Sequence, residues 1–273
     1  MGNRRLGRRR LRSVDGRDAI ANDAWGSVRS AALAVPGIAR GIRSAQVGQM
    51  HGYGFEDLAD IPADGQTTAI WLREDHNSAA VALVANDADF TDGGITLTPG
   101  NGANDPVGLL MANKAFTCTA GKPWWIETSF KMADIDDCEL FFGLIEDTYD
   151  ETVIYGAVAA GAGADKCGFE KATHNSGLIQ AVSSLNAVES AADAVTVTAN
   201  NDVVTLGAHW DGAKVKFYAG FAATGTEVGA LTEVHSTSTV SDQSMALVLQ
   251  MVHTTAAADD PLTVNYVRGA WTV

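Results

Sequence analysis

The chain has 273 residues, 46% of them hydrophobic, so it can bury a substantial core, but it lacks the run of about 18 apolar residues that a membrane span needs. Its net charge of −14 is divided unevenly: residues 1–43 hold ten Arg against three Asp (10 − 3 = +7), and the rest holds nine basic against thirty acidic residues (9 − 30 = −21). The acidic part should be repelled by nucleic acid and anionic membranes, whereas the basic part should seek an anionic surface.

Residues 1–66 are predicted to form an extended or irregular N-terminal arm. Ten glycines, from Gly2 to Gly65, interrupt every candidate helix, and neither helical nor strand periodicity is sustained. Arms of this composition gain structure from what they bind. We therefore expect this arm to precede one globular domain, residues 67–273.

From Thr67 onward, short β-rich runs alternate with clusters of Gly, Asn and Asp, which is typical of an antiparallel sandwich. The acidic, small-residue stretches 156–164 and 187–194 are predicted to be long surface loops. The fold class is predicted to be all-β. Candidate strands lie at residues 69–72, 79–84, 95–98, 107–112, 124–132, 140–145, 167–171, 177–183, 194–198, 203–210, 214–219, 227–235, 245–253 and 262–271.

Residues 124–132 form the clearest single strand. Apolar side chains, among them Trp124 and Ile126, alternate with polar ones, among them Glu127 and Lys131. This period of two predicts one face in the core and one in water. Trp125 lies on the polar face, so we single it out as a candidate ligand or interface residue.

The clearest hairpin joins residues 203–210 to residues 213–218 through Asp211-Gly212. Asp-Gly supplies the positive φ angles that a two-residue type I′ turn requires. The sequence therefore predicts two adjacent antiparallel strands here.

Residues 208–218, Ala-His-Trp-Asp-Gly-Ala-Lys-Val-Lys-Phe-Tyr, resemble the recurrent hairpin of concanavalin-like and laminin-G-like domains. Residues 262–268 resemble the closing strand of that superfamily, and the strands at 124–132 and 141–144 fit the same pattern. The resemblance implies an antiparallel jelly-roll sandwich.

The first eleven residues, Met-Gly-Asn-Arg-Arg-Leu-Gly-Arg-Arg-Arg-Leu, are similar to the starts of virion proteins that decorate or cement the heads of tailed bacteriophages. The resemblance implies a structural protein on the capsid exterior that binds the major capsid protein and stabilises the shell. It also implies a homo-oligomer, for which we expect a trimer. The expected capsid-binding residues are Arg4, Arg5, Arg8, Arg9, Arg10, Arg12 and Arg17.

The arm could also bind nucleic acid or remain a solvated tail. Bases are read by aromatic side chains, and Trp25 is the only aromatic residue before Tyr53. No lysine precedes Lys114, and guanidinium groups favour defined, multidentate pairing with carboxylates. Docking on an acidic protein surface is therefore preferred over nucleic-acid binding, and no membrane partner is expected.

No enzyme is expected. Glycoside hydrolysis by a jelly roll requires two carboxylates on one strand, and no Glu-x-Asp-x-Glu pattern occurs. The acids at 134–137 and 146–151 flank predicted strands and fit solvated loops. Gly-x-Ser-x-Gly is also absent. A hydrolase would have to use Glu139 or Glu146.

No metal or cofactor is expected, although calcium is an alternative because two groups of loop acids supply oxygen ligands. Neither group meets the twelve-residue calcium-loop pattern. The six histidines are dispersed, and the three cysteines, without C-x-x-C spacing, are expected to be buried free thiols. The alternative function is a lectin-like carbohydrate-binding module that uses Trp125 or these acids. The two groups are Asp87, Asp89 and Asp92, and Asp147, Asp150 and Glu151.

Overall fold

A computed structural model of the chain describes residues 48–54, 71–75, 80–84, 89–90, 94–100, 105–111, 114–146, 165–171, 176–186, 188–226, 228–253 and 260–272. The regular elements in these ranges are sixteen β-strands. Within the same ranges, no helix has the length and apolarity to cross a membrane.

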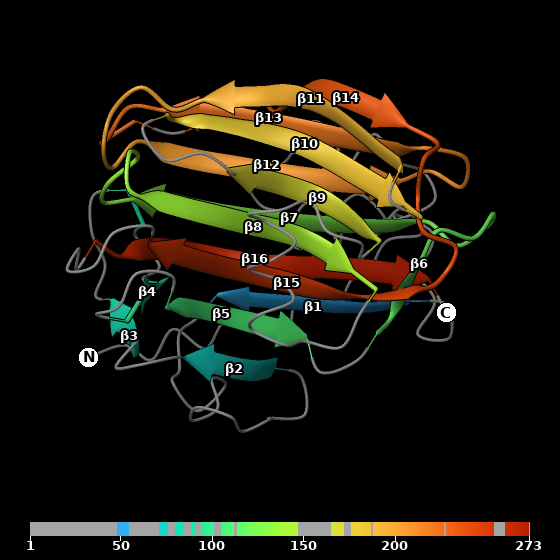
Figure 1. Cartoon of the computed structure of the whole chain (residues 1–273), viewed down its shortest axis with the longest axis horizontal. Helices are drawn as coiled ribbons and strands as arrows, with labels where there is room; N and C mark the ends of the chain where they lie inside the picture. The colour runs from blue at the N-terminus through green and yellow to red at the C-terminus, as the bar shows by residue number, and fades with distance from the viewer. Residues whose placement is uncertain are drawn as a thin grey trace, which may run out of the picture.

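The strands form two antiparallel sheets, one behind the other in Figure 1. Sheet A has the order β14-β13-β12-β7-β16-β4-β3, with β1 also paired to β16. Its strands are β1 (Gly48–Gly54), β3 (Ala80–Val84), β4 (Gly94–Thr98), β7 (Trp124–Met132), β12 (Val203–Trp210), β13 (Val215–Ala222), β14 (Thr232–Thr237) and β16 (Leu262–Thr272).

Sheet B has the order β11-β10-β9-β8-β15-β5-β2, with β6 also paired to β15. Strands distant in sequence lie side by side in both sheets, as a jelly roll requires. Its strands are β2 (Trp71–Asp75), β5 (Pro106–Met111), β6 (Phe116–Thr117), β8 (Cys138–Ile145), β9 (Lys166–Lys171), β10 (Leu178–Leu185), β11 (Val188–Thr196) and β15 (Ser244–His253).

The core lies between the two sheets and is filled by alternate residues of each strand. Trp124 packs edge-on against Phe116 at 6.0 Å between ring centroids, and Phe169 of sheet B meets Phe217 of sheet A at 5.5 Å. The predicted all-β antiparallel sandwich is therefore confirmed.

The predicted hairpin is confirmed as β12 and β13, but its predicted turn is wrong. Trp210 pairs with Val215, so the loop has four residues rather than two. The Asp211 carboxylate accepts from the backbone N–H groups of Ala213 and Lys214, both at 2.9 Å. Only Gly212 has a positive φ, of 101°, whereas a type I′ turn needs two such residues. The aspartate side chain thus stabilises a longer turn.

Two strands occupy segments that the sequence assigned differently. Strand β11 runs through the stretch 187–194, which was predicted to be a loop, because backbone pairing with β10 outweighs its weak β-propensity. Strand β1 lies inside the predicted arm 1–66 and pairs with β16. The part of this segment at 48–54 therefore belongs to the sandwich. The predicted loop 156–164 and the arginines at 4–43 lie outside the described residues.

Candidate functional site

The outer face of sheet A carries a cluster of aromatic and ionisable side chains around Trp125. Alternation in β7 points Trp125 and Glu127 away from the core, and strand pairing sets His209 of β12 opposite Trp125. An irregularity in the pairing of β16 between Val264 and Tyr266 turns Tyr266 to the same face. With Tyr218 of β13, these side chains form what we call the Trp125 cluster: Trp125, Glu127, His209, Tyr218 and Tyr266.

Glu127 is the hydrogen-bond acceptor at the centre of the cluster and is fully buried. Its Oε2 accepts a hydrogen bond from the Trp125 indole N–H at 3.2 Å, and its Oε1 accepts from the Tyr266 hydroxyl. A buried carboxylate is stable only when donors satisfy it, and these two side chains supply them. The arrangement holds all three groups in one fixed geometry.

The Trp125 ring extends across β12 and contacts side chains of β12 and β13. Its centroid is 6.1 Å from that of His209 and 5.5 Å from that of Tyr218. A Cβ on Gly207 would stand 2.6 Å from Cζ2 of the indole, so only glycine lets the ring lie across β12. In the sequence, this site is marked by Gly207, which comes two residues before His209 on the same face of β12.

His209 is buried, and neither of its ring nitrogens has a hydrogen-bond partner among the described residues. Burial lowers the pKa of its imidazole to about 4; Asp211 opposes this shift and Lys216 adds to it. The ring is therefore neutral at pH 7 and presents one donor and one acceptor that no described residue engages.

The predicted exposure of the polar face of β7 is wrong. Trp125 and Glu127 are both 0% exposed, and Ser129 is 4% exposed. Alternation reports which side chains share a face, but it does not report whether the outer face is covered. The role of Trp125 as a ligand or interface residue stays a prediction.

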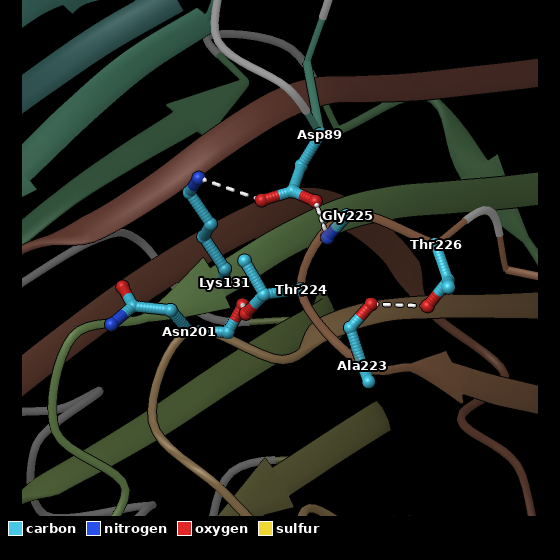
Figure 2. A network of polar contacts seen from close by, with 7 residues as sticks. All are labelled: Asp89, Lys131, Asn201, Ala223, Thr224, Gly225 and Thr226. Atoms are coloured by element: carbon cyan, nitrogen blue, oxygen red, sulfur yellow. Dashed lines mark hydrogen bonds and ion pairs between the residues drawn. The ribbon is translucent and has the colours of Figure 1, made fainter.

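A second polar network joins three loops at one end of the sandwich (Figure 2). Asp89 accepts from Lys131 Nζ at 3.1 Å and from the backbone N–H of Gly225, and Lys131 also lies 5.1 Å from the centroid of Phe90. The Thr224 hydroxyl donates to the Asn201 carbonyl at 2.9 Å. The network ties the loop before β4 to the β13–β14 turn.

The structure places Asp89, a member of the first predicted calcium group, in this network. Its side chain is 2% exposed and forms an ion pair with Lys131, so both carboxylate oxygens are occupied by protein donors. Asp87 and Asp92, like the whole second group, lie outside the described residues. The described residues hold no group of three or more metal-binding side chains.

The acids considered for hydrolysis do not come together. Glu139 lies at the start of β8 and Glu146 directly after its end, which separates them by about 23 Å along an extended strand. Paired glycosidase carboxylates are about 5–10 Å apart. Glu146 lies beside Asp165 instead. Burial raises the pKa of Glu146, and the neighbouring carboxylate of Asp165 raises it further. Asp134 accepts from the backbone N–H of Asp136 in a local turn.

The cysteines are free thiols, as predicted, and burial raises the pKa of each. For Cys118 the pKa rises to about 12. Cys138 and Cys167 are buried, as predicted, whereas Cys118 is half-buried. None has the lowered pKa that marks a reactive thiolate.

The sequence matches no protein-family model and no curated protein. Among solved structures, a protein of unknown function from Shewanella oneidensis MR-1 is similar to this chain with a TM-score of 0.58 and 11% identity, over 84% of this chain and 88% of that one. The acidic lectin of winged bean, bound to methyl-α-galactose, has a TM-score of 0.49 and 12% identity, over 82% and 99%. Peanut lectin has a TM-score of 0.47 and 14% identity, over 74% and 97%.

These likenesses concern the fold alone. The chain is an all-β, antiparallel jelly-roll sandwich of two sheets, as the sequence predicted. At such low identity the fold does not define a function, which has to be argued from the chain's own residues.

Proposed function

We propose that this chain is a non-enzymatic structural protein that binds a large assembly through its arginine-rich N-terminus, as a protein decorating a bacteriophage capsid would. The observation that supports this proposal is the charge separation, with +7 on residues 1–43 against −21 on the rest of the chain (10 − 3 and 9 − 30). An acidic body discourages nonspecific adhesion, so attachment is left to the basic segment.

The described part of the sandwich supports a scaffold role. Two ion pairs lie largely away from water in it: Asp89 with Lys131, and Lys166 with Glu170 at 2.6 Å. Buried, paired charges of this kind fix a structure rather than attack a substrate. The proposed partner is the major capsid protein, on the capsid exterior. Many linked copies on a lattice would add avidity to each weak contact.

Deletion of residues 1–20 tests the proposal directly. We expect the truncated protein to keep its thermal unfolding transition and to lose binding to capsids that lack the native protein, measured by co-sedimentation. Normal occupancy after the deletion would contradict the proposal.

A matched variant tests the role of guanidinium geometry. Replacing the seven arginines by lysines keeps the charge but removes the planar, multidentate donors. Binding to acidic protein should fall in this variant, whereas diffuse binding to nucleic acid would be kept. The replaced residues are Arg4, Arg5, Arg8, Arg9, Arg10, Arg12 and Arg17.

The second candidate function is carbohydrate binding, favoured by the composition of the Trp125 cluster. Aromatic rings stack on the apolar faces of sugars, and Glu127 and His209 offer hydrogen bonds to hydroxyl groups. It ranks second because Trp125 and Glu127 are 0% exposed. A glycan array run with calcium and with chelator separates the two functions, since a scaffold protein should give no sugar-dependent signal.

A further inference from the structure

One end of the core, where β8 begins and β7 and β15 end, brings two sulfur atoms and an imidazole together. The Cys138 thiol lies 3.4 Å from the thioether sulfur of Met132, and His253 is the register partner of Cys138 on the neighbouring strand. Register partners point to the same side of a sheet, which here is the core side that holds Cys138. All three side chains are only 1% exposed. We call these three residues the Cys138 cluster.

His253 has a fixed tautomer that leaves one of its ring nitrogens without a hydrogen bond. Its Nε2 lies 2.8 Å from the backbone carbonyl of Asp260. Because a carbonyl oxygen only accepts, Nε2 carries the proton, and in the neutral ring Nδ1 presents a lone pair. No described residue donates to this buried Nδ1. A buried acceptor without a donor costs free energy, so packing alone does not account for a histidine here.

The hydrogen bond from His253 to a backbone carbonyl is the arrangement that orients a metal-binding histidine. It fixes the ring, raises the basicity of the other nitrogen and directs that nitrogen at the metal ion. Met132 pairs with Leu262, which follows two residues after Asp260. The His253 imidazole, which reaches Asp260, therefore extends toward the end of β7 that holds Met132. The three side chains thus converge from β7, β8 and β15.

The chemistry of the Cys138 cluster favours a soft, monovalent metal ion. Thiolate and thioether ligands select copper(I), and imidazole also suits copper. Among the described residues, no three His, Cys, Asp or Glu side chains are grouped so that they could hold a metal ion, so the thioether is what completes this set. A thiolate and a monovalent ion together carry no net charge, which suits a site shielded from water. Lys171 Nζ donates to the Cys138 carbonyl at 2.6 Å, and its charge would repel a divalent ion more strongly.

We propose that the Cys138 cluster binds one copper(I) ion through the Cys138 thiolate, the Met132 thioether and Nδ1 of His253. The ion replaces the thiol proton, which Cys138 otherwise donates to the Asp134 carbonyl at 3.3 Å, and this proton is released to solvent. The copper keeps its oxidation state. Because Met132 belongs to sheet A and the other two ligands to sheet B, the ion joins the two sheets at this end. This inference goes beyond the proposed function and does not depend on it.

A competition titration of the full-length chain, without oxygen, tests the site against the coloured copper(I) chelator bicinchoninate. The natural protein should withdraw one copper(I) ion per chain from the chelator, and the bound ion should raise the midpoint of thermal unfolding. Cys138→Ser, Met132→Leu and His253→Gln should each raise the Kd by more than about tenfold, since even changes outside the ligand set cost that much. Circular dichroism of the metal-free proteins shows whether each variant is folded.

Two matched controls remove the same chemical groups elsewhere. Cys118→Ser removes a more accessible thiol, and Met245→Leu removes a buried thioether at the opposite end of β15. Both should keep the Kd within about twofold. No copper uptake by the natural protein, or an equal loss for Cys118→Ser and Cys138→Ser, would overturn the proposal.

X-ray absorption at the copper edge tests the ligand set in the natural protein, without any substitution. We expect two sulfur ligands and one nitrogen ligand. Met132→Leu should remove one of the two sulfurs and keep the nitrogen. Ligation by sulfur alone, or a spectrum that Met132→Leu does not change, would show that the ion binds elsewhere and would overturn the proposal.

Discussion

Gly207 of β12 lies against the indole of Trp125, and a Cβ at position 207 would stand 2.6 Å from Cζ2 of that ring. The ring cannot move away freely, because the indole N–H donates to Glu127 and the ring contacts Tyr218. A single methyl group should therefore displace the whole Trp125 cluster.

Gly207→Ala should lower the free energy of unfolding by about 1–3 kcal/mol through overpacking. Urea denaturation monitored by tryptophan fluorescence measures the change. Gly229→Ala is the matched control, since nothing lies within 4 Å of a Cβ there. An equal effect of the two substitutions would contradict the role assigned to Gly207.

The Tyr266 hydroxyl should stabilise the buried charge of Glu127. Tyr266→Phe removes one donor from this carboxylate, and we expect a loss of about 1.5–3 kcal/mol of unfolding free energy. Tyr218 lies on the same face, but its hydroxyl contacts Glu233, which is exposed. Tyr218→Phe should therefore lower the unfolding free energy by less than about 1 kcal/mol. In a Glu127→Gln background, Tyr266→Phe should cause a smaller loss of unfolding free energy. An unchanged loss would show that the hydroxyl does not stabilise the charge of Glu127.

The sequence predicted most strands because alternation and turn residues are local signals. Trp124–Met132 and Val203–Trp210 have the bounds that were predicted. Most of strand β11 was missed, although a strand was predicted at 194–198, because its alanines and acids have low β-propensity and pairing with β10 is what makes it a strand. The Trp125 cluster was only partly foreseen, since its members come from β7, β12, β13 and β16, which only the folded topology brings together.

The ion pair of Asp89 and Lys131 should matter more than an exposed one. Their side chains are 2% and 12% exposed, so removing one partner leaves the charge of the other without a counter-ion and shielded from water. Asp89→Asn and Lys131→Met should each lower the unfolding free energy by about 3 kcal/mol, and the double variant by less than the sum. Chemical denaturation of the natural protein, the two single variants and the double variant measures the four unfolding free energies of this cycle.

The exposed pair of Lys216 and Asp211 provides the comparison for that cycle. Their side chains are 34% and 29% exposed at a separation of 3.0 Å. Lys216→Met should change the unfolding free energy by less than about 1 kcal/mol because solvent screens the pair. Additive effects in the Asp89–Lys131 cycle would mean that the two residues do not interact.

His209 should make the stability of the sandwich depend on pH. Its pKa is about 4 in the folded protein against an ordinary value of 6.5. Above pH 6.5 the imidazole is neutral in both states and adds no pH dependence. As the pH falls below 6.5 the unfolded state takes up a proton first, so stability declines until about pH 4, by roughly 3 kcal/mol in all. Urea unfolding at pH 7 and pH 4.5 should show a smaller decline for His209→Gln than for the natural protein.

The same measurement on His235→Gln separates this effect from general acid sensitivity. Burial also lowers the pKa of His235, which accepts or donates a hydrogen bond with the Ser190 hydroxyl at 3.0 Å, but its ring is more accessible. Its substitution should therefore remove a smaller part of the decline. Carboxylates of the acidic body lower stability in the same pH range, and they contribute equally to all three proteins. A His209→Gln protein whose decline matches that of the natural chain would show that this histidine is protonated as easily in the folded state as in the unfolded one.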